Sequence, residues 1–155
     1  VTLFGIGKLK KIPGSYASLV TTIFLFILFH IFNFSPNIVL IGVIIVFLIS
    51  LYAVNIFIKD LDNKDPKEVV IDEFIGQSIP ICLYEIAHEG SKETGQVLTF
   101  YFIMFILFRF FDIVKPYPVS YYDKNFKNSF GVIMDDVCAG LYVVAVLVLY
   151  MVITS

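Results

Sequence analysis

Three charged side chains stand at intervals of three in one short stretch of the sequence: Arg109, Asp112 and Lys115. On a helix, residues three apart are neighbours on one face. This stretch would therefore present a cation, an anion and a second cation along one wall. Arginine and lysine side chains placed in this way are suited to binding a phosphate group.

Two pairs of adjacent acids lie elsewhere in the chain, Asp72-Glu73 and Asp135-Asp136. The members of a pair point about 100° apart on a helix, so one of each pair can face the inside of a bundle. Carboxylates that converge without His or Cys are ligands for a hard cation such as Mg²⁺. The alternative is structural, because buried acids also pair with Lys and Arg to hold helices together.

Glycines precede the first apolar stretch, in Gly5-x-Gly7 and in Pro13-Gly14-Ser15. Backbone N–H groups in such segments can bind phosphate, although glycines of this kind also mark simple turns. The segments that carry these candidates must be placed by a membrane bundle, because 59% of the residues are apolar and only 15% are charged. The mean hydropathy of +0.90 excludes an ordinary soluble domain.

Other classes of function are excluded by the same composition. The net charge is −2 and no cluster of Lys and Arg interleaved with aromatic residues occurs, so nucleic acid is not an expected partner. The two cysteines, Cys82 and Cys138, stand singly in apolar stretches, and we expect both to be core residues.

Five membrane-embedded helices are expected in a single domain covering residues 1–155. Residues 12–58 carry no charge and would form ~70 Å of helix, enough to cross a bilayer core of ~30 Å twice. The turn-forming residues 33–37 divide this stretch. The predicted helices are 18–32, 38–58, 69–87, 97–114 and 137–155, and the third is short or kinked because it contains Pro80 and two acids. A polar loop is expected between the last two.

The charges sort to one side of these five helices. Only Lys92 falls on the side opposite the other ten basic residues, which are Lys8, Lys10, Lys11, Lys59, Lys64, Lys67, Arg109, Lys115, Lys124 and Lys127. The positive-inside rule makes that side cytoplasmic. All acids except Glu85, Glu89 and Glu93 lie there as well, which predicts a site at the cytoplasmic face.

Four blocks of sequence resemble the phosphatidylglycerophosphatase A family, in the family's order and over nearly the whole chain. They are P-G-S at 13–15, V-I-D-E-F-I-G at 70–76, F-R-F-F-D-I-V-K-P-Y-P at 108–118 and G-V-I-M-D-D-V-C-A-G at 131–140. The third and fourth blocks are specific. The glycine block departs from the family pattern, with Ser15 where Thr is usual and Ala17 where Gly is usual, and Ser15 keeps a hydroxyl group.

The resemblance implies Mg²⁺-dependent hydrolysis of phosphatidylglycerophosphate to phosphatidylglycerol and inorganic phosphate. It implies a multi-pass protein of the bacterial inner membrane, with a phospholipid monoester as substrate and the active site facing the cytoplasm. On this basis the expected metal ligands are Asp72, Glu73, Asp135 and Asp136. The expected substrate-binding residues are Gly14, Ser15, Arg109 and Lys115, of which Arg109 and Lys115 also count as catalytic.

Asp112 is a further catalytic candidate with three possible roles: a metal ligand, a base for the attacking water, or a nucleophile that forms an aspartyl-phosphate. Ligand or base is the favoured assignment. The competing function for the whole chain is a small carrier or channel, in which the same acids would transfer protons or bind a cation. A carrier would distribute polar groups through the depth of the spans, whereas here the acids cluster at one face. The oligomeric state is left open.

Overall fold

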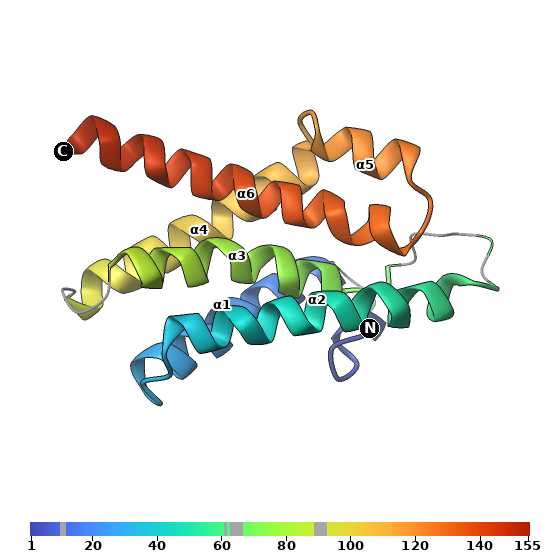
Figure 1. The fold of residues 1–155 in the computed structure, drawn as a ribbon, viewed down its shortest axis with the longest axis horizontal. Helices are drawn as coiled ribbons and strands as arrows, with labels where there is room; N and C mark the ends of the chain where they lie inside the picture. Colours follow the sequence, from blue (N-terminus) through green and yellow to red (C-terminus); the bar gives the residue numbers. More distant parts are fainter. Residues whose placement is uncertain (10–11, 61, 63–66, 89–92) are drawn as a thin grey trace.

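The structure, a computed structural model, describes residues 1–9, 12–60, 62, 67–88 and 93–155. These residues form helices and no strand: a 3-10 turn η1 (Ile6–Lys8), α1 (Pro13–His30), α2 (Pro36–Ile58), α3 (Ile71–Ala87), α4 (Thr94–Val114), α5 (Val119–Asn125) and α6 (Ser129–Thr154). The five long helices lie side by side and the short α5 packs at one end (Figure 1). The predicted all-α bundle is confirmed.

Four helices, α1, α2, α4 and α6, are long and apolar enough to cross a membrane. Large apolar side chains are exposed on them, including Ile38 and Ile49 on α2, Phe102 on α4 and Ile153 on α6. So much exposed apolar surface is stable in lipid and would drive association in water. The protein is a multi-pass membrane protein.

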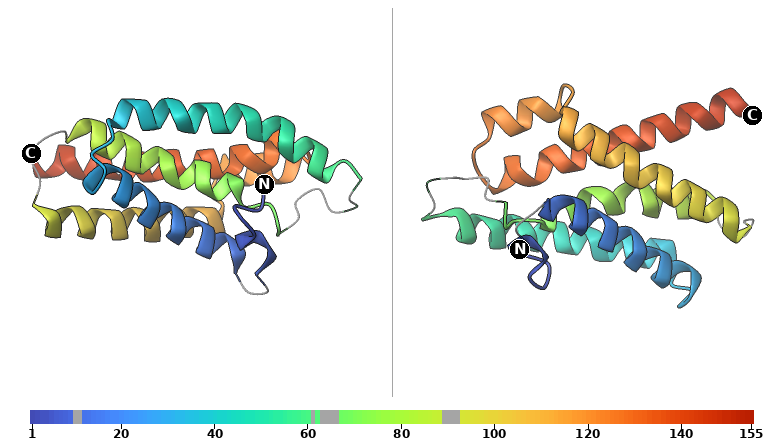
Figure 2. Two further views of the ribbon diagram at one scale, coloured as in Figure 1. Left: turned by 90° about the horizontal axis from the view of Figure 1, so that it is seen from below. Right: turned by 180° about the vertical axis from the view of Figure 1, so that it is seen from behind.

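The shorter α3 is the central helix. It packs against α1, α2, α4 and α6, and Figure 2 shows it between its neighbours. It has 17 residues and contains Pro80, as the sequence predicted for a short third helix. Other helices surround α3, so its environment is mostly protein. This explains how a segment with several polar residues can stand in a membrane bundle.

Described parts of three connecting regions lie at one end of the bundle, at the right of Figure 1: residues 1–9, residues 67–70, and the chain from α4 to α6. The N-terminal segment is held there, because the Val70 backbone N–H donates to the Val1 carbonyl at 3.1 Å. This end carries the candidate residues, and we call it the site end. The α1–α2 turn and the start of α4 lie at the opposite end.

Each of the five predicted helices differs from the structure in at least one boundary, and the largest shifts are at the starts of α1 and α6. The loop after Pro116 contains the unpredicted α5, and α6 begins at Ser129, eight residues before the predicted 137. The Asn128 side chain caps α6 by accepting a bond from the Gly131 N–H at 3.0 Å, and α5 packs against α6. Helix α1 also begins earlier, at Pro13, where the fixed ring angle of proline suits the first helical turn.

Candidate active site

A close crossing of α3 and α6 brings two acids together. A Cβ atom on Gly140 would collide with the Gly76 carbonyl, and one on Gly76 would collide with the Asp136 carbonyl. These contacts need glycine because the two backbones touch. Asp72 stands one turn before Gly76, and Asp136 stands one turn before Gly140. The crossing therefore sets the two carboxylates side by side at the site end.

Glu73 joins this pair. One carboxylate oxygen from each of Asp72, Glu73 and Asp136 lies within 4.8 Å of the other two. Asp72 and Asp136 are buried, with 7% and 3% of their surfaces exposed. Among the residues that the structure describes, Glu73 Oε2 is buried without a hydrogen-bond partner. Three carboxylates so close together repel one another unless a cation lies between them. We call these residues the acid group.

The first turn of α1 lies against Glu73. A Cβ atom on Gly14 would collide with Glu73 Oε1 and would lie 3.3 Å from Arg109 Nη1. Gly14 thus allows the N-terminus of α1 to approach the acid group and the guanidinium closely. Ser15 is partly buried and does not line the cavity described below.

Two basic residues flank the acid group. Arg109 Nη1 donates to Asp112 Oδ2 at 2.5 Å, with both side chains mostly buried. Lys115 Nζ donates to Asp123 Oδ1 at 2.6 Å and to Asp135 Oδ2 at 2.9 Å. Asp135 therefore lies with Lys115, whereas its neighbour Asp136 faces the acid group.

Lys115 remains a cation in this setting. Burial lowers the pKa of Lys115, but Asp135 and Asp123 together outweigh burial and raise that pKa above its usual value. Its side chain is 28% exposed, so it contacts both the two acids and the cavity. Lys115 also ties the end of α4 to α5 and α6 through the same two bonds.

A cavity of about 650 Å³ opens beside these residues at the site end. Every charged residue predicted for the site lines it, and so does Gly14; the full lining is Gly7, Lys8, Leu9, Ile12, Pro13, Gly14, Lys67, Glu68, Val69, Asp72, Glu73, Arg109, Asp112, Lys115, Asp135 and Asp136. The cavity is large enough for a phosphate group and part of a lipid headgroup.

Several site residues were missed by the sequence analysis. Lys8, Lys67 and Glu68 line the cavity, and Gly7 packs so closely on Glu68 that a Cβ atom would collide with its carbonyl. The sequence feature that could have identified Lys67 and Glu68 is their position shortly before Asp72. Gln77 was also missed. It is fully buried on α3, and neither polar atom of its side chain has a hydrogen-bond partner within the described ranges.

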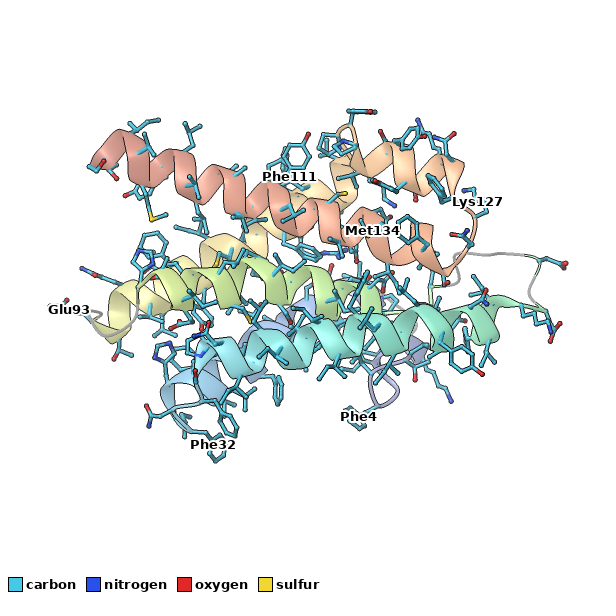
Figure 3. All side chains as sticks on the ribbon, in the orientation of Figure 1. Phe4, Phe32, Glu93, Phe111, Lys127 and Met134 are labelled. Atoms are coloured by element: carbon cyan, nitrogen blue, oxygen red, sulfur yellow. The ribbon has the colours of Figure 1, made fainter. Side chains whose placement is uncertain are left out.

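A different polar cluster occupies the opposite end of the bundle, the end at which Figure 3 labels Phe32 and Glu93. Glu85 Oε1 lies 3.1 Å from His30 Nε2 and accepts a bond from the Tyr101 hydroxyl at 2.8 Å. These residues come from α3, α1 and α4 and join the three helices. The predicted core positions Cys82 and Cys138 are confirmed as buried free cysteines.

Comparison with known proteins shows to which family the chain belongs. The family described as phosphatidylglycerophosphatase A matches residues 1–151. A Haemophilus influenzae protein named phosphatidylglycerophosphatase A is 35% identical over 92% of this chain and 81% of its own length. The chain belongs to the phosphatidylglycerophosphatase A family. It is therefore a phosphatase, which decides between the phosphatase and carrier predictions in favour of the enzyme.

Two further relatives match the chain, and one of them has a different name. An Escherichia coli K12 protein, also named phosphatidylglycerophosphatase A, is 27% identical over 89% of this chain and 73% of its own length. A Bacteroides thetaiotaomicron protein is 32% identical over 91% of this chain and 84% of its own length, and is provisionally named phosphatidylinositol-3-phosphatase. No solved structure matches the chain. The relatives that match this chain thus include proteins named for different phospholipid monoesters.

Proposed function

We propose that the protein hydrolyses the terminal phosphate of phosphatidylglycerophosphate, giving phosphatidylglycerol and inorganic phosphate. Family membership and the names of the H. influenzae and E. coli relatives support this substrate. The observation that carries the proposal is the acid group, which lies beside Arg109 in a cavity at one end of a membrane bundle. A lipid can place its headgroup there while its acyl chains stay in the membrane.

Mg²⁺ is the cofactor in this proposal, and the acid group fits it. Three carboxylate oxygens within 4.8 Å of one another are hard ligands, and Glu73 Oε2 has no other partner among the described residues. We assign Asp72, Glu73 and Asp136 as the ligands. Asp135, which the sequence analysis included, is assigned to Lys115 instead. Mg²⁺ bound here would neutralise phosphoryl oxygens and lower the pKa of a coordinated water molecule.

The phosphate would be held by Arg109, Lys115 and the start of α1. Arg109 and Lys115 supply positive charge at the cavity wall. Gly14 lies in the first turn of α1, where N–H groups and the positive end of the helix dipole favour an anion. Ser15 stays in the proposal only as part of that turn. Asp112 Oδ2 is already bound to Arg109, so we assign Asp112 to holding this guanidinium toward the cavity.

The reaction is a single displacement by water. The water oxygen forms a bond to phosphorus while the bond from phosphorus to the glycerol oxygen breaks. A carboxylate of the site accepts one proton from the attacking water and later returns it to solvent. The glycerol oxygen leaves with the bonding electron pair and takes a proton from solvent in the cavity. The products are the alcohol of phosphatidylglycerol and inorganic phosphate.

Phosphate release from lipid monoesters in detergent micelles tests the proposal. The substrates are phosphatidylglycerophosphate, phosphatidylinositol 3-phosphate and phosphatidic acid, each with Mg²⁺ and with EDTA. We expect the fastest release from phosphatidylglycerophosphate, its loss in EDTA, and its recovery when Mg²⁺ is added back. Faster release from another lipid would contradict the substrate, and undiminished release in EDTA would contradict the metal. No release from any lipid would contradict the phosphatase.

The site end is proposed to face the cytoplasm of a bacterial inner membrane, on the strength of the ten basic residues counted above. A cysteine in place of the exposed Lys124 on α5 tests this orientation, because both native cysteines are buried. A membrane-impermeant maleimide should label Lys124→Cys in inverted inner-membrane vesicles and leave it unlabelled in intact spheroplasts. Labelling in intact spheroplasts would contradict the proposed orientation and would place the site end outside the cytoplasm.

A further inference from the structure

Lys8 and Lys67 line the cavity, and the reaction proposed above gives neither of them a role. The other two cations of the cavity wall, Arg109 and Lys115, are each paired with acids of the site. Lys8 and Lys67 are exposed, and neither forms an ion pair with any residue that the structure describes. Their positive charges are therefore available to an anion that enters the cavity.

The two lysines come from segments of the chain that touch each other. Lys8 is the last residue of η1 and follows Gly7, whereas Lys67 directly precedes Glu68. A Cβ atom on Gly7 would collide with the Glu68 carbonyl, so the two backbones are in direct contact at this point. The contact brings both lysines to one part of the cavity wall.

This part of the wall is the mouth of the cavity. The acid group marks the inner end, where two of its three side chains are buried, whereas Lys8 and Lys67 are exposed. Two exposed apolar side chains line the cavity as well: Leu9, directly after Lys8, and Ile12. The mouth therefore combines two cations with an apolar surface.

The proposed substrate carries its chemical groups in a matching order. Its terminal phosphate monoester is followed by glycerol, then by a negatively charged phosphodiester, and then by diacylglycerol with its acyl chains. When the monoester lies between the acid group and Arg109, the phosphodiester lies nearer the mouth. Cations next to apolar side chains suit an anion that is attached to a lipid.

We propose that Lys8 and Lys67 bind the phosphodiester of the substrate. The inference rests on the proposed phosphatase activity and states how the same site recognises its lipid. Phosphatidic acid has a monoester but no phosphodiester, so it lacks this contact. The two lysines thus favour phosphatidylglycerophosphate over phosphatidic acid through binding. They lie away from the bond that breaks, so they act on KM and not on kcat.

A double variant, Lys8→Gln with Lys67→Gln, tests the proposal in detergent mixed micelles. We expect KM for phosphatidylglycerophosphate to rise about tenfold, because two charge contacts at an exposed site are lost. The value of kcat should stay within twofold of the wild type, because the acid group and Arg109 are unchanged.

Two competitive inhibitors separate the two phosphate positions. Phosphatidylglycerol carries the phosphodiester without the monoester, and its inhibition constant should rise about tenfold in the double variant. Inorganic phosphate occupies the monoester position alone, so its inhibition constant should stay within twofold.

Two control variants accompany this measurement. Lys8→Arg combined with Lys67→Arg keeps both positive charges and should keep the wild-type constants. Lys124→Gln removes one charge from the exposed surface of α5, outside the cavity lining, and should also leave the constants unchanged.

The possible outcomes distinguish this inference from the proposed function. Unchanged constants in the double glutamine variant would overturn the inference while leaving the phosphatase intact. Equal rises in the inhibition constants of phosphatidylglycerol and inorganic phosphate would overturn the phosphodiester assignment, as would an equal rise of KM in Lys124→Gln. A wild type that releases no phosphate would overturn the proposed function itself, and the inference with it.

Discussion

Helix α3 carries buried carboxylates at both ends, and the two ends differ in how those groups are satisfied. Near its C-terminus, Glu85 is bonded to His30 and Tyr101 from two neighbouring helices. At its N-terminus, Asp72 and Glu73 meet a third acid, Asp136, and open onto a cavity. Both ends hold buried acids, but among the residues that the structure describes only the N-terminal end brings three carboxylates together.

This difference separates a structural acid from a functional one. A carboxylate that holds helices together is stabilised by donors from those helices, as Glu85 is by the Tyr101 hydroxyl. Three carboxylates within 4.8 Å of one another repel each other, and a cation bound between them would offset that repulsion. The contrast supports assigning the metal to the site end, and it makes Glu85 a matched control for the acid group.

The largest effect is expected when the contrast is tested directly with Asp136→Asn and Glu85→Gln. Both changes keep the shape of the side chain. Asp136→Asn should lower kcat by at least about 1000-fold, because a metal ligand and its charge are lost. Glu85→Gln should keep kcat within threefold while lowering the free energy of unfolding by about 1–3 kcal/mol. Phosphate release and thermal unfolding in detergent measure the two effects, and equal losses of activity would remove the distinction.

A smaller effect is expected from separating the helices that form the acid group. Gly140→Ala places a methyl group against the Gly76 carbonyl, so α3 and α6 must move apart. We expect the free energy of unfolding to fall by about 1–3 kcal/mol and kcat to fall about tenfold. Gly42→Ala on α2 is the control, because a Cβ atom there meets nothing within 4 Å. Equal activity in the two variants would argue against the crossing as the feature that positions the acids.

The smallest effect is expected at the cavity wall. Lys115→Ala should raise KM about fivefold to tenfold, since one cation that binds phosphate is lost, and should leave kcat within threefold. Lys124→Ala on the exposed face of α5 should leave KM unchanged. Initial rates over a range of lipid concentrations in mixed micelles measure both constants. A KM for Lys115→Ala that matches the wild type would count against phosphate binding by this residue.

The sequence predicted the all-α bundle, and it picked out charged residues that the structure brings to one cavity, because both follow from strong local signals. Apolar stretches set the long helices, and Pro80 with the acids set the short third helix. Counting the charged residues on each side of the expected helices placed the acids, Arg109 and Lys115 at the same face of the membrane. The glycines at 76 and 140 were quoted as part of the family blocks, but their role in the α3–α6 crossing became visible only in three dimensions.

The details that were wrong or missed depend on tertiary contacts. Helix α5 and the early start of α6 stabilise each other by packing and by the Asn128 cap, which apolar periodicity does not report. The choice between Asp135 and Asp136 depends on the rotation of α6 relative to Lys115. Gln77 carries no charge and stands in no metal-binding pattern, so only its complete burial and missing partners within the described residues draw attention to it.

The most direct test of the metal assignment is a measurement of Mn²⁺ binding, because Mn²⁺ substitutes for Mg²⁺ at oxygen sites. Electron paramagnetic resonance measures the bound Mn²⁺, with inorganic phosphate present. The wild type and Glu85→Gln should each bind one Mn²⁺ per chain with the same affinity. Asp136→Asn should bind at least about tenfold more weakly, because one of three carboxylate ligands is lost. Equal binding by Asp136→Asn and the wild type would contradict the account.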